Sequence, residues 1–138
     1  MSATIDMQHM RYLNLFERVA RVSTRFCFKY NNTIFFCVPK PLLRKAVGEN
    51  ASNVRRVSQI LAKKIKIIPI PNQPNHIRPF VESIVSPVPF KDLEIRGNEV
   101  ILSASTQSKA ALIGRDKVRL FEMQKIISDF FNKEFKII

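Results

Sequence analysis

The sequence predicts an α+β protein built from two small units, each a three-stranded sheet covered by helices in the order α-β-β-α-α-β. Two related segments indicate the repeat: "AVGENASNVRRVSQIL" begins at Ala46 and "LIGRDKVRLFEMQKII" begins at Leu112. Each segment places a glycine between stretches with helical spacing, and Gly48 and Gly114 lie 66 positions apart. A proline-rich stretch separates the two copies. We therefore expect a first domain over residues 1–72 and a second over residues 73–138.

Size and composition are those of a folded protein. The chain has 138 residues, and its hydrophobic content of 46% is enough to build an interior. No apolar run approaches the roughly 20 residues that a membrane span requires, and the amino terminus lacks a basic and then hydrophobic signal pattern. These features lead us to expect a cytoplasmic monomer without a membrane partner.

The first unit should begin with an amphipathic helix over residues 5–21. Apolar side chains recur there near helical spacing, at Met7, Met10, Leu13, Leu15, Phe16 and Val19. We expect the methionines to fill the core. The next segment, "RFCFKYNNTIFFCVP", has two β-prone runs around Asn31 and Asn32, which tolerate the left-handed conformation of a tight turn.

The hairpin register determines what the two cysteines can do. A two-residue turn at Asn31–Asn32 pairs Cys27 with Phe36 and sends Cys37 to the other face of the sheet. The sequence therefore predicts no disulfide between Cys27 and Cys37, and two cysteines alone form no metal site.

A helix–glycine–helix segment and a closing strand should complete the first unit. The segment "KPLLRKAV" predicts a short helix that ends at Gly48, and "ASNVRRVSQILAKK" predicts a second helix. Its expected apolar face consists of Val54, Val57, Ile60 and Leu61. The run "IKIIPI" reads as the closing strand, and the four prolines between Pro69 and Pro79 suggest a stiff linker.

The second unit repeats this order. Pro79 suits the first turn of a helix, and "FKDLEIRGNEVILSAS" alternates as two strands about a turn at Gly97–Asn98. "TQSKAALI" predicts the short helix, Gly114 the loop, and "KEFKII" the last strand. The long helix between them should be lined by Leu120, Met123, Ile126, Ile127, Phe130 and Phe131.

The formal net charge of +12 is concentrated in the first half of the chain. Residues 1–74 hold 13 Lys and Arg against 3 acidic residues, whereas residues 75–138 hold 10 against 8. Such a balance favours a polyanionic partner, with nucleic acid ahead of an acidic membrane surface. A basic surface that serves only solubility is the alternative interpretation.

A glycine loop between two helices suits a phosphate group. The second helix has unsatisfied N–H groups and a positive dipole end at its start, and a glycine lets a phosphate approach the backbone. Two helices joined in this way on a three-stranded sheet resemble a KH domain, whose GxxG loop clamps about four nucleotides of single-stranded nucleic acid. The element order is similar to the type II KH arrangement.

The whole chain resembles the archaeal NusA-like proteins, which consist of two tandem type II KH domains. The resemblance rests on "RYLNLFE", Cys27, "VGENASNVRRVSQILAKKIKII", the stretch from Phe80 to Pro87, and "LIGRDKVRL". It implies an RNA-binding factor of transcription termination or antitermination that grips single-stranded nascent RNA near RNA polymerase. No cofactor is implied.

The resemblance also assigns candidate RNA-binding residues in both loops. They are Gly48, Asn50, Ala51, Ser52, Asn53, Arg55 and Arg56 in the first, and Gly114, Arg115, Asp116, Lys117 and Arg119 in the second. The candidates for an apolar groove that holds the bases are Val47, Val54, Ile113 and Leu120. Packing of helix on sheet alone would also require apolar residues at these positions.

Both loops depart from the GxxG pattern. In the first, Glu49 replaces the usual basic residue and Ala51 the second glycine; in the second, Lys117 stands at the final glycine. A carboxylate at ~6 Å from a phosphate would cost about 1 to 3 kcal/mol, more than the helix dipole returns. We therefore expect the first unit to attract RNA broadly and the second to grip it.

Two other function classes were weighed. An enzyme is not expected, because His9 and His76 lie far apart in the sequence and no phosphate-loop lysine motif is present. A degenerate KH scaffold that docks on RNA polymerase or another protein, without tight RNA binding, is the main alternative, since both loops are altered.

Overall fold

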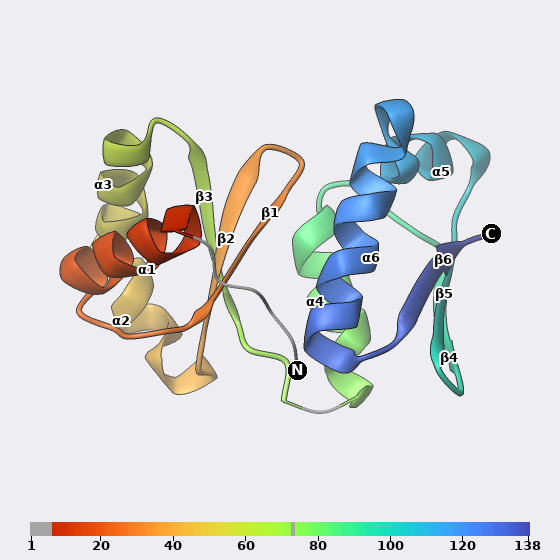
Figure 1. The fold of residues 1–138 in the computed structure, drawn as a ribbon, viewed down its shortest axis with the longest axis horizontal. Helices are drawn as coiled ribbons and strands as arrows, with labels where there is room; N and C mark the ends of the chain where they lie inside the picture. The colour runs from red at the N-terminus through yellow and green to blue at the C-terminus, as the bar shows by residue number, and fades with distance from the viewer. Residues whose placement is uncertain (1–6, 73) are drawn as a thin grey trace. The chain divides into compact units, whose positions relative to one another are not determined.

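The computed structural model describes residues 7–72 and 74–138 and contains two three-stranded sheets with six α-helices in that part of the chain (Figure 1). The chain separates into two compact units, the first ending at Ile70 and the second beginning at Pro71. Both units have the order helix, strand, strand, helix, helix, strand. The predicted α+β class and the predicted element order are therefore confirmed.

The first unit contains three helices and three strands. They are α1 (Met7–Ala20), β1 (Phe26–Tyr30), β2 (Thr33–Val38), α2 (Leu43–Val47), α3 (Ser52–Leu61) and β3 (Lys64–Pro69). Two short 3-10 turns, Lys40–Leu42 and Glu49–Ala51, precede α2 and α3. The expected helix "KPLLRKAV" thus begins as a 3-10 turn that contains Pro41 and becomes α-helical only at Leu43.

The hairpin of the first unit has the predicted register. Asn31 and Asn32 adopt positive φ angles of 51° and 59°, and Cys27 lies directly opposite Phe36. Cys37 pairs with Phe26 and therefore points to the other face of the sheet, so the two thiols lie on opposite sides and no disulfide joins them. Burial raises the pKa of the Cys37 thiol above its ordinary value, with a smaller contribution from Cys27.

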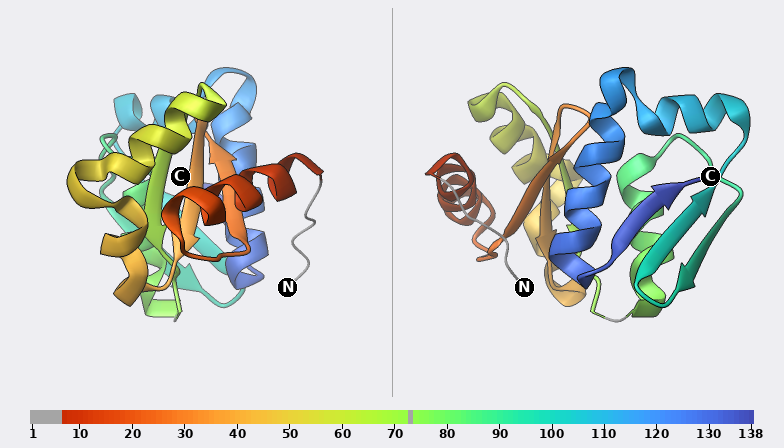
Figure 2. Two further views of the ribbon diagram at one scale, coloured as in Figure 1. Left: turned by 90° about the vertical axis from the view of Figure 1, so that its left-hand side faces the viewer. Right: turned by 45° about the vertical axis from the view of Figure 1, so that its right-hand side comes forward.

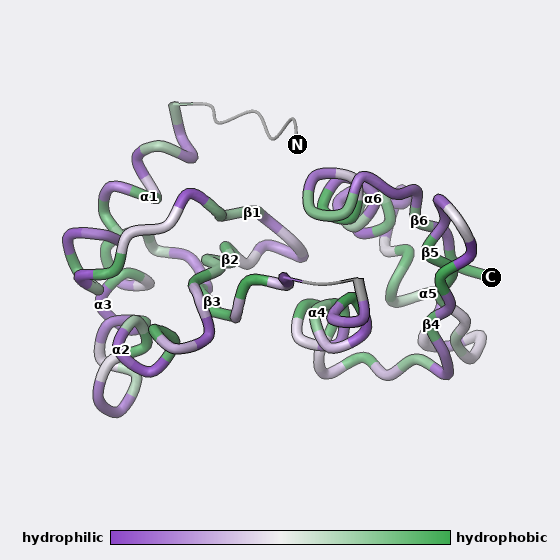
Figure 3. Tube along the Cα trace, turned by 90° about the horizontal axis from the view of Figure 1, so that it is seen from below, coloured by the Kyte–Doolittle hydropathy of each residue, from purple (hydrophilic) through white to green (hydrophobic). Residues whose placement is uncertain are grey.

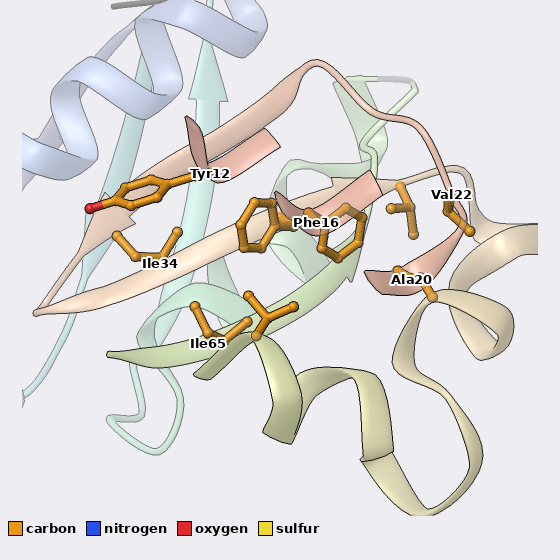
Figure 4. Packing of buried hydrophobic residues seen from close by; sticks show 10 residues of the cluster. Tyr12, Phe16, Ala20, Val22, Ile34 and Ile65 are labelled. Carbon is orange, nitrogen blue, oxygen red and sulfur yellow. The ribbon is translucent and has the colours of Figure 1, made fainter. Parts of the chain in front are cut away.

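Strand β2 is the centre of the first sheet, antiparallel to β1 and parallel to β3. The three helices cover one face of this sheet, as the left view of Figure 2 shows. The ring of Phe16 stacks on that of Phe36 with 4.4 Å between centroids. Figure 4 shows Phe16 among the buried hydrophobic side chains of this core. The core around this pair comprises Tyr12, Ala20, Val22, Ile34, Val38, Ala46, Val57 and Ile65.

Two expectations for the first core are wrong. Met7 is 75% exposed and Met10 is 52% exposed, because the buried stripe of α1 runs through Tyr12, Phe16 and Ala20 at intervals of four residues. Ile60 is 56% exposed, since it lies in the last turn of α3 and off the stripe that contains Val57.

The second unit repeats the arrangement with a shorter first helix and longer second and third helices. Its elements are α4 (Ile77–Val85), β4 (Asp92–Arg96), β5 (Glu99–Ser103), α5 (Thr106–Ile113), α6 (Val118–Phe131) and β6 (Glu134–Ile137). A 3-10 turn, Pro74–His76, precedes α4, and another, Arg115–Lys117, precedes α6. Pro79 lies in the first turn of α4, as expected.

Much of the expected proline-rich linker belongs to regular elements. Pro69 is the last residue of β3, opposite Val38, and Pro74 is the first residue of a 3-10 turn. A proline is tolerated at Pro69 because β3 is an edge strand, so its missing N–H interrupts no ladder.

The second sheet has the same topology as the first. Strand β5 is antiparallel to β4 across the Gly97–Asn98 turn and parallel to β6. Helix α6 contributes Met123, Ile126 and Ile127 to the core, and Phe80 of α4 packs against the ring of Phe130 at 5.0 Å between centroids. Figure 3 shows hydrophobic and hydrophilic residues alternating around α4 and α6.

The faces of the two sheets that point away from the helices differ in chemistry. The first carries stacked rings of Phe28 and Phe35, 5.1 Å apart between centroids. The second carries exposed ion pairs, Arg96 with Glu94 and Lys136 with Glu99. The repeat therefore preserves the core and the loops but not this surface.

The Phe16–Phe36 pair gives a test of the first core. Replacing Phe36 with alanine should lower the free energy of unfolding by about 3–5 kcal/mol, because a fully buried ring leaves a cavity. Ile60→Ala is the matched control and should change it by less than about 0.5 kcal/mol. Urea unfolding followed by circular dichroism measures both; equal effects of the two variants would contradict the packing described.

Candidate functional site

Each unit contains a glycine loop between its second and third helices, and the two loops have nearly the same backbone. Gly48 ends α2 with φ 82° and ψ 166°, and Gly114 ends α5 with φ 75° and ψ 172°. The third and fourth loop positions are left-handed in both: φ is 54° and 60° at Asn50 and Ala51, and 55° and 62° at Asp116 and Lys117. The repeat seen in the sequence is thus a repeat of conformation.

Glycine is required at the first loop position for two reasons. The positive φ is one that side chains rarely adopt, and the space that a Cβ would occupy is already filled. A Cβ on Gly48 would lie 2.7 Å from Oγ of Ser52, and one on Gly114 would lie 2.9 Å from Cγ of Arg119. The following helix therefore packs directly against each glycine.

Backbone hydrogen bonds close both loops in the same way. The Gly48 N–H donates to the Arg44 carbonyl at 3.0 Å, and the Ala51 N–H donates to the Gly48 carbonyl at 3.1 Å. The corresponding bonds in the second loop join Gly114 to Ala110 at 3.0 Å and Lys117 to Gly114 at 3.2 Å.

The starts of α3 and α6 carry no capping side chain. Neither Ala51 nor Lys117, the N-cap residues, makes a side-chain hydrogen bond to its helix. By contrast, Oγ of Ser105 at the start of α5 accepts a hydrogen bond from the Ser108 N–H. The first N–H of α3, on Ser52, donates to the Glu49 carbonyl, and the first N–H of α6, on Val118, donates to the Arg115 carbonyl. No side chain covers either helix start, which is the positive end of the helix dipole.

A side chain one position into each following helix ties the two helices together. Nδ2 of Asn53 donates to the carbonyls of Lys45 and Ala46, both at 3.2 Å. At the equivalent position 66 residues later, Nη1 of Arg119 donates to the Ala111 carbonyl at 2.9 Å. These two candidate RNA-binding residues hold the last turn of the preceding helix, a positioning role that no local sequence pattern indicated.

Arg55 also bonds within its own loop, through Nη1 to the Asn50 carbonyl. Its guanidinium keeps further N–H donors, and both Arg55 and Arg56 are exposed. Ser52 is exposed as well. The candidate residues of the first unit lie in the loop and in the first two turns of α3: Gly48, Asn50, Ala51, Ser52, Asn53, Arg55 and Arg56.

The charged side chains of the loops are exposed to solvent. Glu49 is exposed and forms no ion pair with any residue that the structure describes. In the second loop Arg115 and Lys117 are exposed beside Asp116. Arg115, Lys117 and Arg119 exceed Asp116 by two charges, and Arg115 and Lys117 are the more exposed of the three cations because Arg119 donates to the Ala111 carbonyl.

The apolar neighbours of the loops are half-buried. Val47, Val54, Ile113 and Leu120 each retain partial exposure, and Val54 packs against the core of the first unit. Packing of helix on sheet accounts for Val54.

Two other kinds of feature are absent from the described part of the chain. Across residues 7–72 and 74–138, no three His, Cys, Asp or Glu side chains are grouped so that they could hold a metal ion. No helix in these residues has both the length and the apolar character to span a membrane.

Comparison with known proteins supports the fold alone. No protein-family model and no curated protein sequence matches the chain. Eleven chains of solved structures match, among them the crystal structure of APE1850, with a TM-score of 0.64 and 19% sequence identity. That match covers 97% of this chain and 99% of the other. The two proteins share a fold over their whole lengths.

Two substitutions with different expected effects on the free energy of unfolding test the backbone of the first loop. Ala51→Gly should raise the free energy of unfolding or leave it unchanged, because relief of the left-handed strain, about 1–2 kcal/mol, offsets the greater entropy of the unfolded chain. Gly48→Ala should lower it by about 2 kcal/mol or more, since strain and overlap with Ser52 act together. Denaturant unfolding measures both variants, and a destabilising Ala51→Gly would contradict the assigned backbone.

Proposed function

We propose that the protein binds single-stranded RNA through two type II KH domains, each gripping the sugar–phosphate backbone at its glycine loop. The observation that carries the proposal is the duplicated loop: two turns of the same unusual conformation, each leaving an uncapped helix start and each beside exposed cations. The geometry recurs 66 residues later although the two four-residue loops share only their glycine.

The ligand is inferred from charge and geometry together. The first unit carries 13 Lys and Arg side chains against Glu17 and Glu49 over residues 7–70, which favours an extended polyanion. An uncapped helix start suits a phosphate oxygen, and the glycine allows close approach of the backbone. A strand with regularly spaced phosphates can use both loops, whereas a small anion would use only one.

The resemblance to archaeal NusA-like proteins extends the proposal to a cellular role. On that basis the chain is a cytoplasmic factor of transcription termination or antitermination that acts on nascent RNA near RNA polymerase. The proposed role needs no cofactor and a single copy of the chain.

A protein-docking scaffold is the second candidate. The exposed Glu49 favours it for the first unit, because a carboxylate at the loop opposes a phosphate and has no cationic partner among the residues of the described chain. Under this alternative the basic surface contacts an acidic face of another protein, such as RNA polymerase.

Charge reversal in the second loop tests RNA binding. Arg115→Glu combined with Lys117→Glu should weaken binding of fluorescein-labelled single-stranded RNA at least tenfold, because two exposed phosphate contacts become repulsive. The salt slope, the change of log affinity with log salt concentration, should become less steep by about 1.4, given about 0.7 per phosphate on a single strand. Fluorescence anisotropy from 50 to 200 mM salt measures both quantities.

The matched control is Lys91→Glu combined with Arg96→Glu, which changes the net charge by the same amount at exposed positions outside the loop. It should weaken binding much less than the loop variant does. Equal losses would reduce the interaction to general charge attraction. Failure of the unmodified protein to bind RNA at low salt, together with capture of an acidic protein, would favour the scaffold.

A further inference from the structure

One side of helix α6 exposes two apolar side chains immediately after the second loop. Val118 is 52% exposed and Phe121 is 56% exposed, and Lys125 and Ser128 are exposed on the same helix. Their spacing of three, four and three residues places all four on one side of the helix. The opposite side buries Met123, Ile126 and Ile127.

Phe121 is not needed for the core of its unit. Phe80, Phe130 and Phe131 pack their rings together, with centroid separations of 5.0 to 6.5 Å. Phe121 joins no such ring contact with the other described residues, and more than half of it faces solvent. An exposed aromatic ring of this kind is a free surface on which another flat group can stack.

The first unit shows that the fold does not require apolar residues at these positions. The residues 66 positions before Val118 and Phe121 are Ser52 and Arg55, both exposed and polar. The same helix start therefore forms with polar side chains. The apolar pair belongs to the second unit alone.

The charges around this surface indicate the class of ligand. Arg115 and Lys117 are exposed at the head of α6, and Lys125 is exposed one turn beyond Phe121, at about 6 Å of helix rise. Asp116 and Glu122 are the carboxylates nearest in the sequence, so these three cations exceed them by one positive charge. A flat apolar ring between cations fits a strand that alternates anionic phosphates with flat bases.

We propose that Phe121 is a stacking platform for a nucleobase of the RNA strand whose phosphate is held at the Gly114 loop, with Val118 as the adjoining apolar contact. The inference rests on the proposed function and adds a residue outside the glycine loops. It assigns the second unit an aromatic contact to a base, whereas the equivalent residue of the first unit is Arg55, which donates to the Asn50 carbonyl. Stacking of this kind tolerates any base, since every base has a flat face.

The test compares side chains that differ in flatness. Single-stranded RNA containing 2-aminopurine reports stacking by fluorescence quenching, and anisotropy of labelled RNA reports affinity. Phe121→Ala should weaken binding at least fivefold, the lower end of the range for one stacked base, and should abolish the quenching. Phe121→Leu should behave like Phe121→Ala, whereas Phe121→Tyr should stay within twofold of the unmodified protein.

The control variant is Ile60→Leu, at a side chain of equal exposed fraction in the first unit, and it should leave affinity unchanged. Circular dichroism of each variant checks that it is folded. If Phe121→Leu retains affinity, the contact is a general apolar one and the stacking proposal is overturned. If Phe121→Ala retains affinity while the Arg115 and Lys117 double variant loses it, RNA binding stands and only this inference fails. If neither change matters, the proposed function itself fails.

Discussion

The left-handed turn that follows each glycine is the constraint on which both the fold and the candidate site depend. Gly48 and Gly114 allow the next helix to pack so closely that an added Cβ would overlap with it. This close turn brings the two helices that flank the loop onto one face of the sheet. Ala46 and Val57 are buried there in the first unit, and Leu112 in the second. The same turn leaves the start of the second helix without a cap. Core packing and a helix start without a side-chain cap therefore arise from one backbone conformation.

Different side chains at equivalent positions of the repeat join the two helices that flank each loop. Asn53 reaches two carbonyls of α2 and Arg119 reaches one carbonyl of α5, yet both join the helices on either side of the loop. Arg119 therefore has a positioning role as well as a charge, because a hydrogen bond to a neutral carbonyl leaves its guanidinium cationic. Arg115 and Lys117 are the exposed cations of the second loop.

Sequence patterns predicted the element order, both hairpin turns and the pairing of Cys27 with Phe36, because these depend on local periodicity and on residues that tolerate a positive φ. The burial of individual helix residues was predicted less well. Met7 and Met10 are exposed because the buried stripe of α1 runs through Tyr12, Phe16 and Ala20, and Ile60 is exposed in the last turn of α3. The bonds made by Asn53 and Arg119 had no sequence signal, since their partners lie on another helix. Nor did any pattern indicate that Ala51 and Lys117 are left-handed.

At Lys117 the residue type that would best stabilise the fold differs most clearly from the one that suits the proposed function. Its left-handed backbone is one that a side chain makes costly, and its cation stands at the positive end of a helix dipole, where negative charge is preferred. Ala51 shares the backbone strain but introduces no charge. In the folded protein alone, a glycine at position 117 would be the better choice on both counts. An anion bound at the start of α6 reverses the second penalty, because the helix end and the ammonium group then attract it together. The unfavourable lysine is therefore an argument for a bound phosphate at the second loop. The first loop, with Glu49 and Ala51, provides no such argument.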